Sequence, residues 1–213
     1  MNRLIKYHAI IVDLDGTLYF QRPVQLCMLF YILFFYLTHP LKWKELLIVR
    51  DYRKLYTNHI NHLERCSQLA QQYRLRICDV EHIIQNWMIN RPLLLLKTFR
   101  DKNLLAFLHD VQRYDIKVII YSDYPVVDKL KVLDLMPYAA YSADDLGCLK
   151  PSPEGLLEII KKNKLVISDC LFIGDKYEKD GKCAKSVGMD YIILSQGIRK
   201  RRKYYDMLGM WFR

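Results

Sequence analysis

The sequence lacks the paired cysteines typical of zinc ribbons and thiol–disulfide enzymes. No two of its six cysteines form a Cys-x-x-Cys pair, and several stand in apolar runs, where a thiol packs as a small hydrophobic side chain. The six are Cys27, Cys66, Cys78, Cys148, Cys170 and Cys183. We therefore expect reduced thiols without zinc or disulfides, and a protein of the reducing cytosol.

The sequence also lacks a secretory leader and an apolar run long enough for a simple transmembrane helix. The first apolar stretch breaks at Asp13, which is too early for a signal peptide. The longest apolar run extends from Leu26 to Leu37 and rises about 18 Å as a helix, whereas a bilayer span needs roughly 20 residues. This run fits a buried helix, the wall of an apolar pocket or a segment that dips into a membrane surface.

Acidic residues are the minority among the charged ones. There are 23 Asp and Glu residues against 33 Lys and Arg residues, a formal net charge of +10. Such an excess favours anionic partners: phosphorylated metabolites, nucleic acid or an acidic membrane face. No recognised nucleic-acid-binding module accompanies the charge, so we expect a phosphorylated small-molecule substrate and no specific nucleic acid. The oligomeric state stays open.

The C-terminal tail concentrates this positive charge beside apolar residues. Five consecutive basic residues run from Arg199 to Lys203. Aromatic and other apolar residues follow them, namely Tyr204, Tyr205, Met207, Leu208, Met210, Trp211 and Phe212. The tail fits either a terminal helix docked on a core, with a solvated basic patch, or contact with an anionic bilayer. Peripheral contact with the inner face of a membrane is therefore a second interpretation beside a purely cytoplasmic protein.

Two kinds of organisation follow one another along the chain. Strand patterns at 9–12, 117–123, 139–144, 170–175 and 190–195 alternate with helical patterns, which predicts right-handed crossovers and a mostly parallel sheet. Helix starts are expected near Asp101, at Pro125 and at Ser152-Pro153. Between residues 20 and 95 only helical patterns appear. We therefore expect an α/β core from residues 1–19 and 96–213, interrupted by an all-α insertion.

Within the insertion, several local features predict helix boundaries. His39-Pro40 should break the apolar helix, and residues 41–60 and 63–73 have helical spacing. Asp79 is the expected N-cap of the next helix. Arg91-Pro92 is expected to close the region, because a residue before proline disfavours helix.

Polar residues gather where the predicted strands end. Asp13 and Asp15 lie two residues apart and so share one face of a strand end, where like charges repel unless a cation or a shared proton compensates them. Parallel strands end at the same sheet edge, which brings functional loops together. That edge collects Asp13, Asp15, Ser122, Asp123, Lys150, Asp175 and Asp180.

Four motifs in order resemble those of the haloacid dehalogenase superfamily of phosphohydrolases. They read VDLDGT, IIYSD, LKPSPEG and FIGDKYEKDGKCAKSVGM. The resemblance implies a Rossmann-like, doubly wound core, and the insertion after the first motif resembles the family's helical cap. It also implies that Asp13 attacks phosphorus to form an aspartyl-phosphate, and that Asp15 is the general acid and base.

The resemblance further implies Mg²⁺ and a phosphate site. The ion would be held by the Asp13 carboxylate, the Asp15 backbone carbonyl and Asp175, with Asp180 binding Lys150 or a metal-bound water. The implied phosphate contacts are Thr17, Ser122, Asp123 and Lys150. An asparagine is frequent in relatives where Asp123 stands, so its carboxylate is expected to turn away and leave only its amide facing inward.

Three functions remain open at this point. The first is a Mg²⁺-dependent phosphomonoester phosphatase, favoured over a dehalogenase because carbon–halogen cleavage needs no acid like Asp15 to protonate an alkoxide. The second is a phosphomutase, which would share the same acids. The third is a protein that binds a membrane surface or a lipid-linked phosphate.

Overall fold

The computed structural model describes residues 6–55 and 62–211. The chain divides into a core unit, Met1–Arg22 with Phe99–Arg213, and a helical unit, Pro23–Thr98. The boundaries expected from the sequence, after residue 19 and before residue 96, lie within a few residues of this division. All six cysteines are free thiols.

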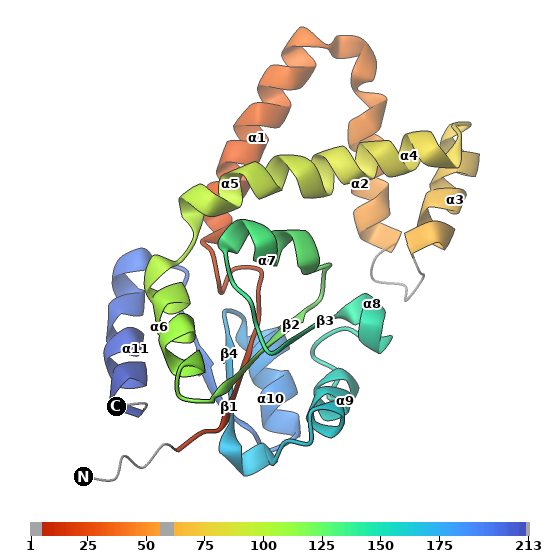
Figure 1. The fold of residues 1–213 in the computed structure, drawn as a ribbon. Coiled ribbons are helices and arrows are strands. Elements are labelled where there is room, and N and C mark those ends of the chain that lie inside the picture. Colours follow the sequence, from red (N-terminus) through yellow and green to blue (C-terminus); the bar gives the residue numbers. More distant parts are fainter. Residues whose placement is uncertain (1–5, 56–61, 212–213) are drawn as a thin grey trace. The chain divides into compact units, whose positions relative to one another are not determined.

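The core unit is built on one parallel sheet, as predicted (Figure 1). Within the described residues it has five strands in the order β3-β2-β1-β4-β5. They are β1 Ala9–Val12, β2 Lys117–Ser122, β3 Ala139–Ser142, β4 Cys170–Gly174 and β5 Asp190–Ile193. Val12 lies opposite Ile120 on one side and Ile173 on the other. Because the register is in step, the residues after β1, β2 and β4 emerge together at one edge.

Helices cover the sheet on both faces. The core helices are α6 Lys102–Gln112, α7 Val127–Leu133, α8 Ala143–Leu146, α9 Glu154–Lys162, η4 Ile167–Asp169, η5 Tyr177–Gly181, α10 Lys182–Ser186 and α11 Ile198–Trp211. One face buries apolar side chains of α9 and α10 against the strands, including Leu156, Cys183 and Phe172. On the other face α6 packs on β2 and lies beside α11 (Figure 1). Burying both faces explains the near-continuous apolar strands.

The helix expected between Pro125 and Leu135 is shorter than predicted. It begins at Val127, two residues after the proline, and ends at Leu133. Asp134 has a φ of +56°, a left-handed conformation that stops the helix. The start near Asp101 is confirmed, because its side chain accepts a hydrogen bond from the Leu104 amide at 3.1 Å.

The helical unit contains only helices among its described residues. They are α1 Gln21–Thr38, η1 Pro40–Lys42, α2 Lys44–Leu55, α3 His62–Tyr73, α4 Ile77–Ile84, η3 Gln85–Asn90 and α5 Arg91–Phe99. Residues 56–60 of the helix expected at 41–60 lie outside the described residues. The break at His39-Pro40 is confirmed, since α1 ends at Thr38 and η1 begins at Pro40.

Two boundary predictions in the insertion are wrong. Asp79 is not an N-cap: α4 begins at Ile77, and the Asp79 carboxylate accepts two hydrogen bonds from the Arg76 side chain at 2.8 and 2.9 Å. Nor does Arg91-Pro92 close the region, because the chain stays helical from α4 into α5. The intervening η3 is a π-helix, whose wider turn gives the proline ring the room that an α-helix lacks.

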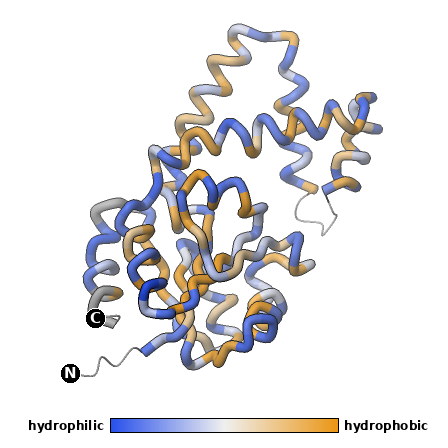
Figure 2. Tube along the Cα trace, in the orientation of Figure 1, coloured by the Kyte–Doolittle hydropathy of each residue, from blue (hydrophilic) through white to orange (hydrophobic). Residues whose placement is uncertain are grey.

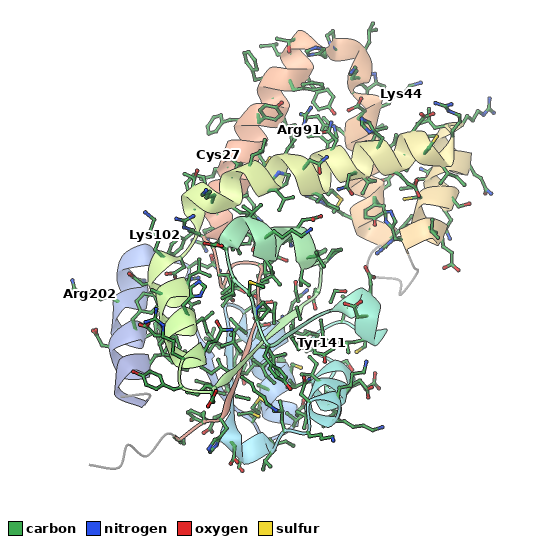
Figure 3. The ribbon with its side chains drawn as sticks, in the orientation of Figure 1. Cys27, Lys44, Arg91, Lys102, Tyr141 and Arg202 are labelled. Carbon is green, nitrogen blue, oxygen red and sulfur yellow. The ribbon has the colours of Figure 1, made fainter. Side chains whose placement is uncertain are left out.

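The basic tail forms α11, and its charges do not all face solvent. Arg201 is fully buried within the core unit, whereas Arg202, labelled in Figure 3, lies on the outer side of the helix. The tail is therefore a docked terminal helix, and its basic run is not a uniformly solvated patch. Phe212 lies outside the described residues, as do the side chains of Arg199, Met207, Met210 and Trp211.

Candidate active site

The site starts from Asp13, which directly follows β1. The carboxylate is buried, and both of its oxygens are held. Lys150 Nζ donates to Oδ1 at 2.5 Å, and the buried Thr17 hydroxyl donates to Oδ2 at 2.9 Å. The turn after the strand brings Thr17 back under Asp13, with the Thr17 amide donating to the Leu14 carbonyl at 3.3 Å. Asp13 is therefore fixed in one orientation before any substrate arrives.

Lys150 connects the third and fourth motifs through a buried network. Its ammonium also contacts Asp180 Oδ1 at 2.7 Å and the Tyr121 carbonyl at 3.2 Å. Burial disfavours the charged amine, but the carboxylates of Asp13 and Asp180 outweigh it and raise the pKa of Lys150. Lys150 is thus a permanent positive charge at the sheet edge.

The fourth-motif acids have different surroundings. Asp180 Oδ2 accepts the amides of Asp175 and Lys176, each at 3.1 Å, so Asp180 shapes the loop after β4. Asp175 keeps a more open carboxylate, which receives a hydrogen bond from the Gln196 side-chain amide. Metal ligation by Asp180 stays a prediction, since both of its oxygens already accept hydrogen bonds.

Asp15 sits in a second basic environment. Lys129 Nζ, on α7, binds both carboxylate oxygens at 2.6 and 2.7 Å. The Tyr19 hydroxyl donates to Oδ1, and the buried Ser122 hydroxyl donates to Oδ2 at 3.3 Å. Burial alone would raise the pKa of Asp15, but the Lys129 charge and these hydrogen bonds outweigh it and hold that pKa below its usual value.

Asp123 turns its carboxylate toward the loop that carries Lys150. It accepts the Lys150 backbone amide at 3.1 Å and the Lys179 ammonium at 2.5 Å. These contacts give the carboxylate a positioning role for Lys150. The predicted phosphate contact of its amide stays a prediction.

A family model described as haloacid dehalogenase-like hydrolase matches residues 7–188. The chain belongs to the haloacid dehalogenase-like hydrolases. The 2-haloacid dehalogenase from Pseudomonas syringae pv. Tomato DC3000 is similar at 17% identity, over 88% of this chain and 86% of that one, with a TM-score of 0.65. YfnB from Bacillus subtilis, bound to magnesium, is similar at 16% identity over 96% and 99%, with a TM-score of 0.64.

A third similar structure is the HAD phosphatase from Thermococcus onnurineus, with 16% identity over 94% of this chain and 97% of that one, and a TM-score of 0.55. No match was found among curated proteins. Identities this low support the shared fold alone, so the reaction has to be argued from the residues of this haloacid dehalogenase-like hydrolase.

The acids of this family member fit a divalent cation. Oxygens of Asp13, Asp175 and Asp180 lie within 4.8 Å of one another, and carboxylate oxygens are the ligands that Mg²⁺ prefers. Burial raises the pKa of Asp13 to about 7 against the opposing charge of Lys150, and Asp180 and Asp175 add to the rise. Burial likewise raises the pKa of Asp175 to about 6. The negative charge at this edge is thus under-compensated by the protein itself.

Arg201 holds the first-motif loop from behind. Its guanidinium donates to the carbonyls of Gly16, of Thr17 at 2.7 Å and of Ser195 at 2.7 Å, and to Asp101 Oδ2 at 2.8 Å. Every partner lies in the core unit. The loop that carries Asp13 and Asp15 is therefore tied to the N-terminal end of α6 and to the start of α11.

Sequence reasoning brought together Asp13, Asp15, Thr17, Ser122, Asp123, Lys150, Asp175 and Asp180, and the structure places all of them at one edge of the sheet. It missed the residues outside the motifs. Lys129 resembled an ordinary helix-surface lysine, Gln196 a loop residue, and Arg201 part of a solvated basic run. The only available clue was that these positions follow predicted strands at the same sheet edge.

Gly16 is required at the centre of this loop. Its φ is +97°, and a side chain there would overlap Oδ2 of Asp175, with Asp175 Cγ only 2.8 Å from the added Cβ. We expect Gly16→Ala to weaken Mg²⁺ binding by about tenfold or more, because Asp175 must move. Calorimetric titration with Mg²⁺ measures this.

Gly147→Ala is the matched control. Gly147 has a φ of +69°, so the backbone strain is similar, but an added Cβ meets nothing within 4 Å. Its Mg²⁺ affinity should equal that of the unaltered protein. Equal affinities in both variants would show that Asp175 is not a ligand.

Proposed function

We propose that this protein is a Mg²⁺-dependent phosphatase that hydrolyses a phosphomonoester through an aspartyl-phosphate on Asp13. The observation that carries the proposal is the pairing of two buried carboxylates with distinct partners: Asp13 on Lys150 and Thr17, and Asp15 on Lys129. A nucleophile and a separate acid–base group are what phosphoryl transfer to an aspartate requires.

In the first step a carboxylate oxygen of Asp13 bonds to phosphorus as the bond from phosphorus to the leaving alcohol's oxygen breaks. That oxygen takes a proton from Asp15. The Lys150 ammonium and the Ser122 hydroxyl stabilise the negative charge on the transferring phosphoryl group. Both groups are buried, where such interactions are stronger than in water.

In the second step Asp15 takes a proton from water, and the water oxygen bonds to phosphorus. The bond between phosphorus and the Asp13 carboxylate breaks, releasing inorganic phosphate. The ion pair with Lys129 suits this step because it keeps Asp15 ionised. For the first step Asp15 must carry a proton, so in this proposal substrate binding draws Lys129 away from it.

Asp13, Asp175 and the Asp15 backbone carbonyl would hold Mg²⁺, with Asp180 beside them. When bound, the cation offsets the acids' mutual repulsion and the charge of the phosphate. The chain's own contribution is to hold those acids in place: Thr17 orients Asp13, and Asp180 fixes the Asp175 amide.

The metal requirement gives the first test. With an aryl phosphate as substrate, EDTA should abolish phosphate release, and added Mg²⁺ should restore it, because carboxylates this close cannot bind a phosphate dianion unaided. Inorganic phosphate is measured before and after chelation. Turnover that persists in excess EDTA would rule out the proposal.

A panel of phosphomonoesters and 2-haloacids then separates the related reactions. A phosphatase releases phosphate stoichiometrically with alcohol. Isomerisation of a sugar phosphate without phosphate release would show a mutase instead, and halide release from a 2-haloacid would show a dehalogenase. The panel includes sugar, nucleotide and lipid phosphates, because nothing in the core motifs selects the leaving group.

A further inference from the structure

The first helix of the helical unit carries an exposed apolar face. Its members recur at alternating spacings of three and one, so they form a single row along α1, and each is between 51% and 81% exposed. We call this row the outer stripe; it consists of Leu26, Leu29, Phe30, Leu33, Phe34 and Leu37. Figure 2 colours most of α1 in the hydrophobic range. An exposed apolar row of this length marks an interaction surface.

The other face of α1 already has its partner inside the helical unit. The rings of Phe35 and Tyr36 lie 5.2 and 5.5 Å from that of Trp87 in η3. The Arg91 guanidinium lies over the rings of Tyr31, Phe35 and Trp87 at 3.8–4.8 Å (Figure 3). The internal packing of the unit therefore uses one side of the helix and leaves the outer stripe uncovered there.

The charges around the stripe have one sign. Residues 16–44 contain no Asp or Glu, while Arg22 precedes the stripe and Lys42 and Lys44 follow it. All three basic residues are exposed. Glu45, the next acid, accepts a hydrogen bond from Trp87 Nε1 at 2.8 Å, on the packed side of the unit.

The chain continues the apolar surface past the end of α1. Leu41 is 94% exposed, and Trp43, between the two lysines, is exposed as well. Trp next to Lys is a common pair at the level of lipid headgroups. In the described residues no single helix is both long and apolar enough to cross a bilayer; only α1 taken with the helical segment Pro40–Leu55 reaches that length, and the pair is bent by 116°.

We propose that the outer stripe docks on an anionic bilayer, with α1 lying along the surface and Lys42, Trp43 and Lys44 at the headgroups. An apolar helix face with basic ends fits such a surface through both apolar burial and attraction to anionic lipid. A second copy of the chain fits less well. A two-fold pair brings identical patches together, so basic ends would meet basic ends with no acid within the segment to compensate them.

Vesicle sedimentation of the full chain tests this proposal without substrate or metal, so its outcome is independent of the proposed phosphatase activity. Vesicles of phosphatidylcholine alone are compared with vesicles that also contain phosphatidylglycerol. The protein should sediment with the anionic vesicles. The variant Phe30→Ser/Phe34→Ser should lower its partition coefficient by about tenfold or more, because two large apolar side chains lose their burial.

Two further variants make the result decisive. Leu94→Ser/Met136→Ser removes equally exposed apolar side chains elsewhere and should change partitioning by less than about twofold. Lys42→Gln/Lys44→Gln, at exposed positions, should reduce the preference for anionic over neutral vesicles while thermal unfolding stays unchanged.

The proposal fails if the unaltered protein stays in the supernatant of anionic vesicles. It fails equally if the stripe and control variants sediment alike. A dimer in sedimentation equilibrium that the stripe substitutions convert to monomer, without vesicle binding, would assign the stripe to a second copy of the chain.

Discussion

Asp13→Asn reduces phosphate release by about four orders of magnitude or more, the largest effect we expect from any single substitution. Asparagine has the same shape and can still accept a hydrogen bond from Thr17. It cannot attack phosphorus as an anion, and it leaves the buried Lys150 ammonium with only Asp180 as a charged partner at its 2.7 Å contact. The nucleophile is lost while the rest of the site persists.

Steady-state kinetics with the best substrate from the panel measures this loss. Asp110→Asn is the matched control, because that carboxylate is exposed and makes only a 3.6 Å surface pair with Arg113. It should retain full activity. If Asp13→Asn kept more than about a tenth of the kcat, another group would have to be the nucleophile.

Arg201→Met lowers the free energy of unfolding by about 3–5 kcal/mol, the largest stability change we expect. Methionine fills the volume of the stem but leaves the buried Asp101 carboxylate without its cation. It also removes the donor to the carbonyls of Gly16, Thr17 and Ser195. Denaturant unfolding followed by circular dichroism gives this free energy.

A double-substitution cycle separates the stranded charge from the lost donors. Asp101→Asn keeps an N-cap side chain for α6 but removes the charge, so Arg201→Met/Asp101→Asn should be more stable than the sum of the single changes predicts, by about 1–3 kcal/mol. The neighbouring Arg202→Met should change stability by no more than about 0.5 kcal/mol, since that side chain is exposed. Equal effects of the two arginine substitutions would disprove the buried clamp.

The sheet and the acids of the site were predictable because both depend on short stretches of chain. A run such as residues 9–12 encodes a buried strand by its composition, and parallel strands place whatever follows them at one edge. Asp13, Ser122 and Asp175 meet there for that reason alone. Local boundaries were less predictable: Pro92 sits inside a continuous helical run because a π-helical turn makes room for it.

The sequence by itself determined the strands, the order of the motifs and the identity of the acids, since each is encoded within a few neighbouring residues. Only the tertiary structure decided that Lys129 pairs with Asp15, that Arg201 is buried behind the first-motif loop, and that one face of α1 is packed while the other is bare. Those facts depend on which distant segments come into contact. Composition and spacing are the same for a lysine, an arginine or a leucine whether its neighbour is water or another part of the chain.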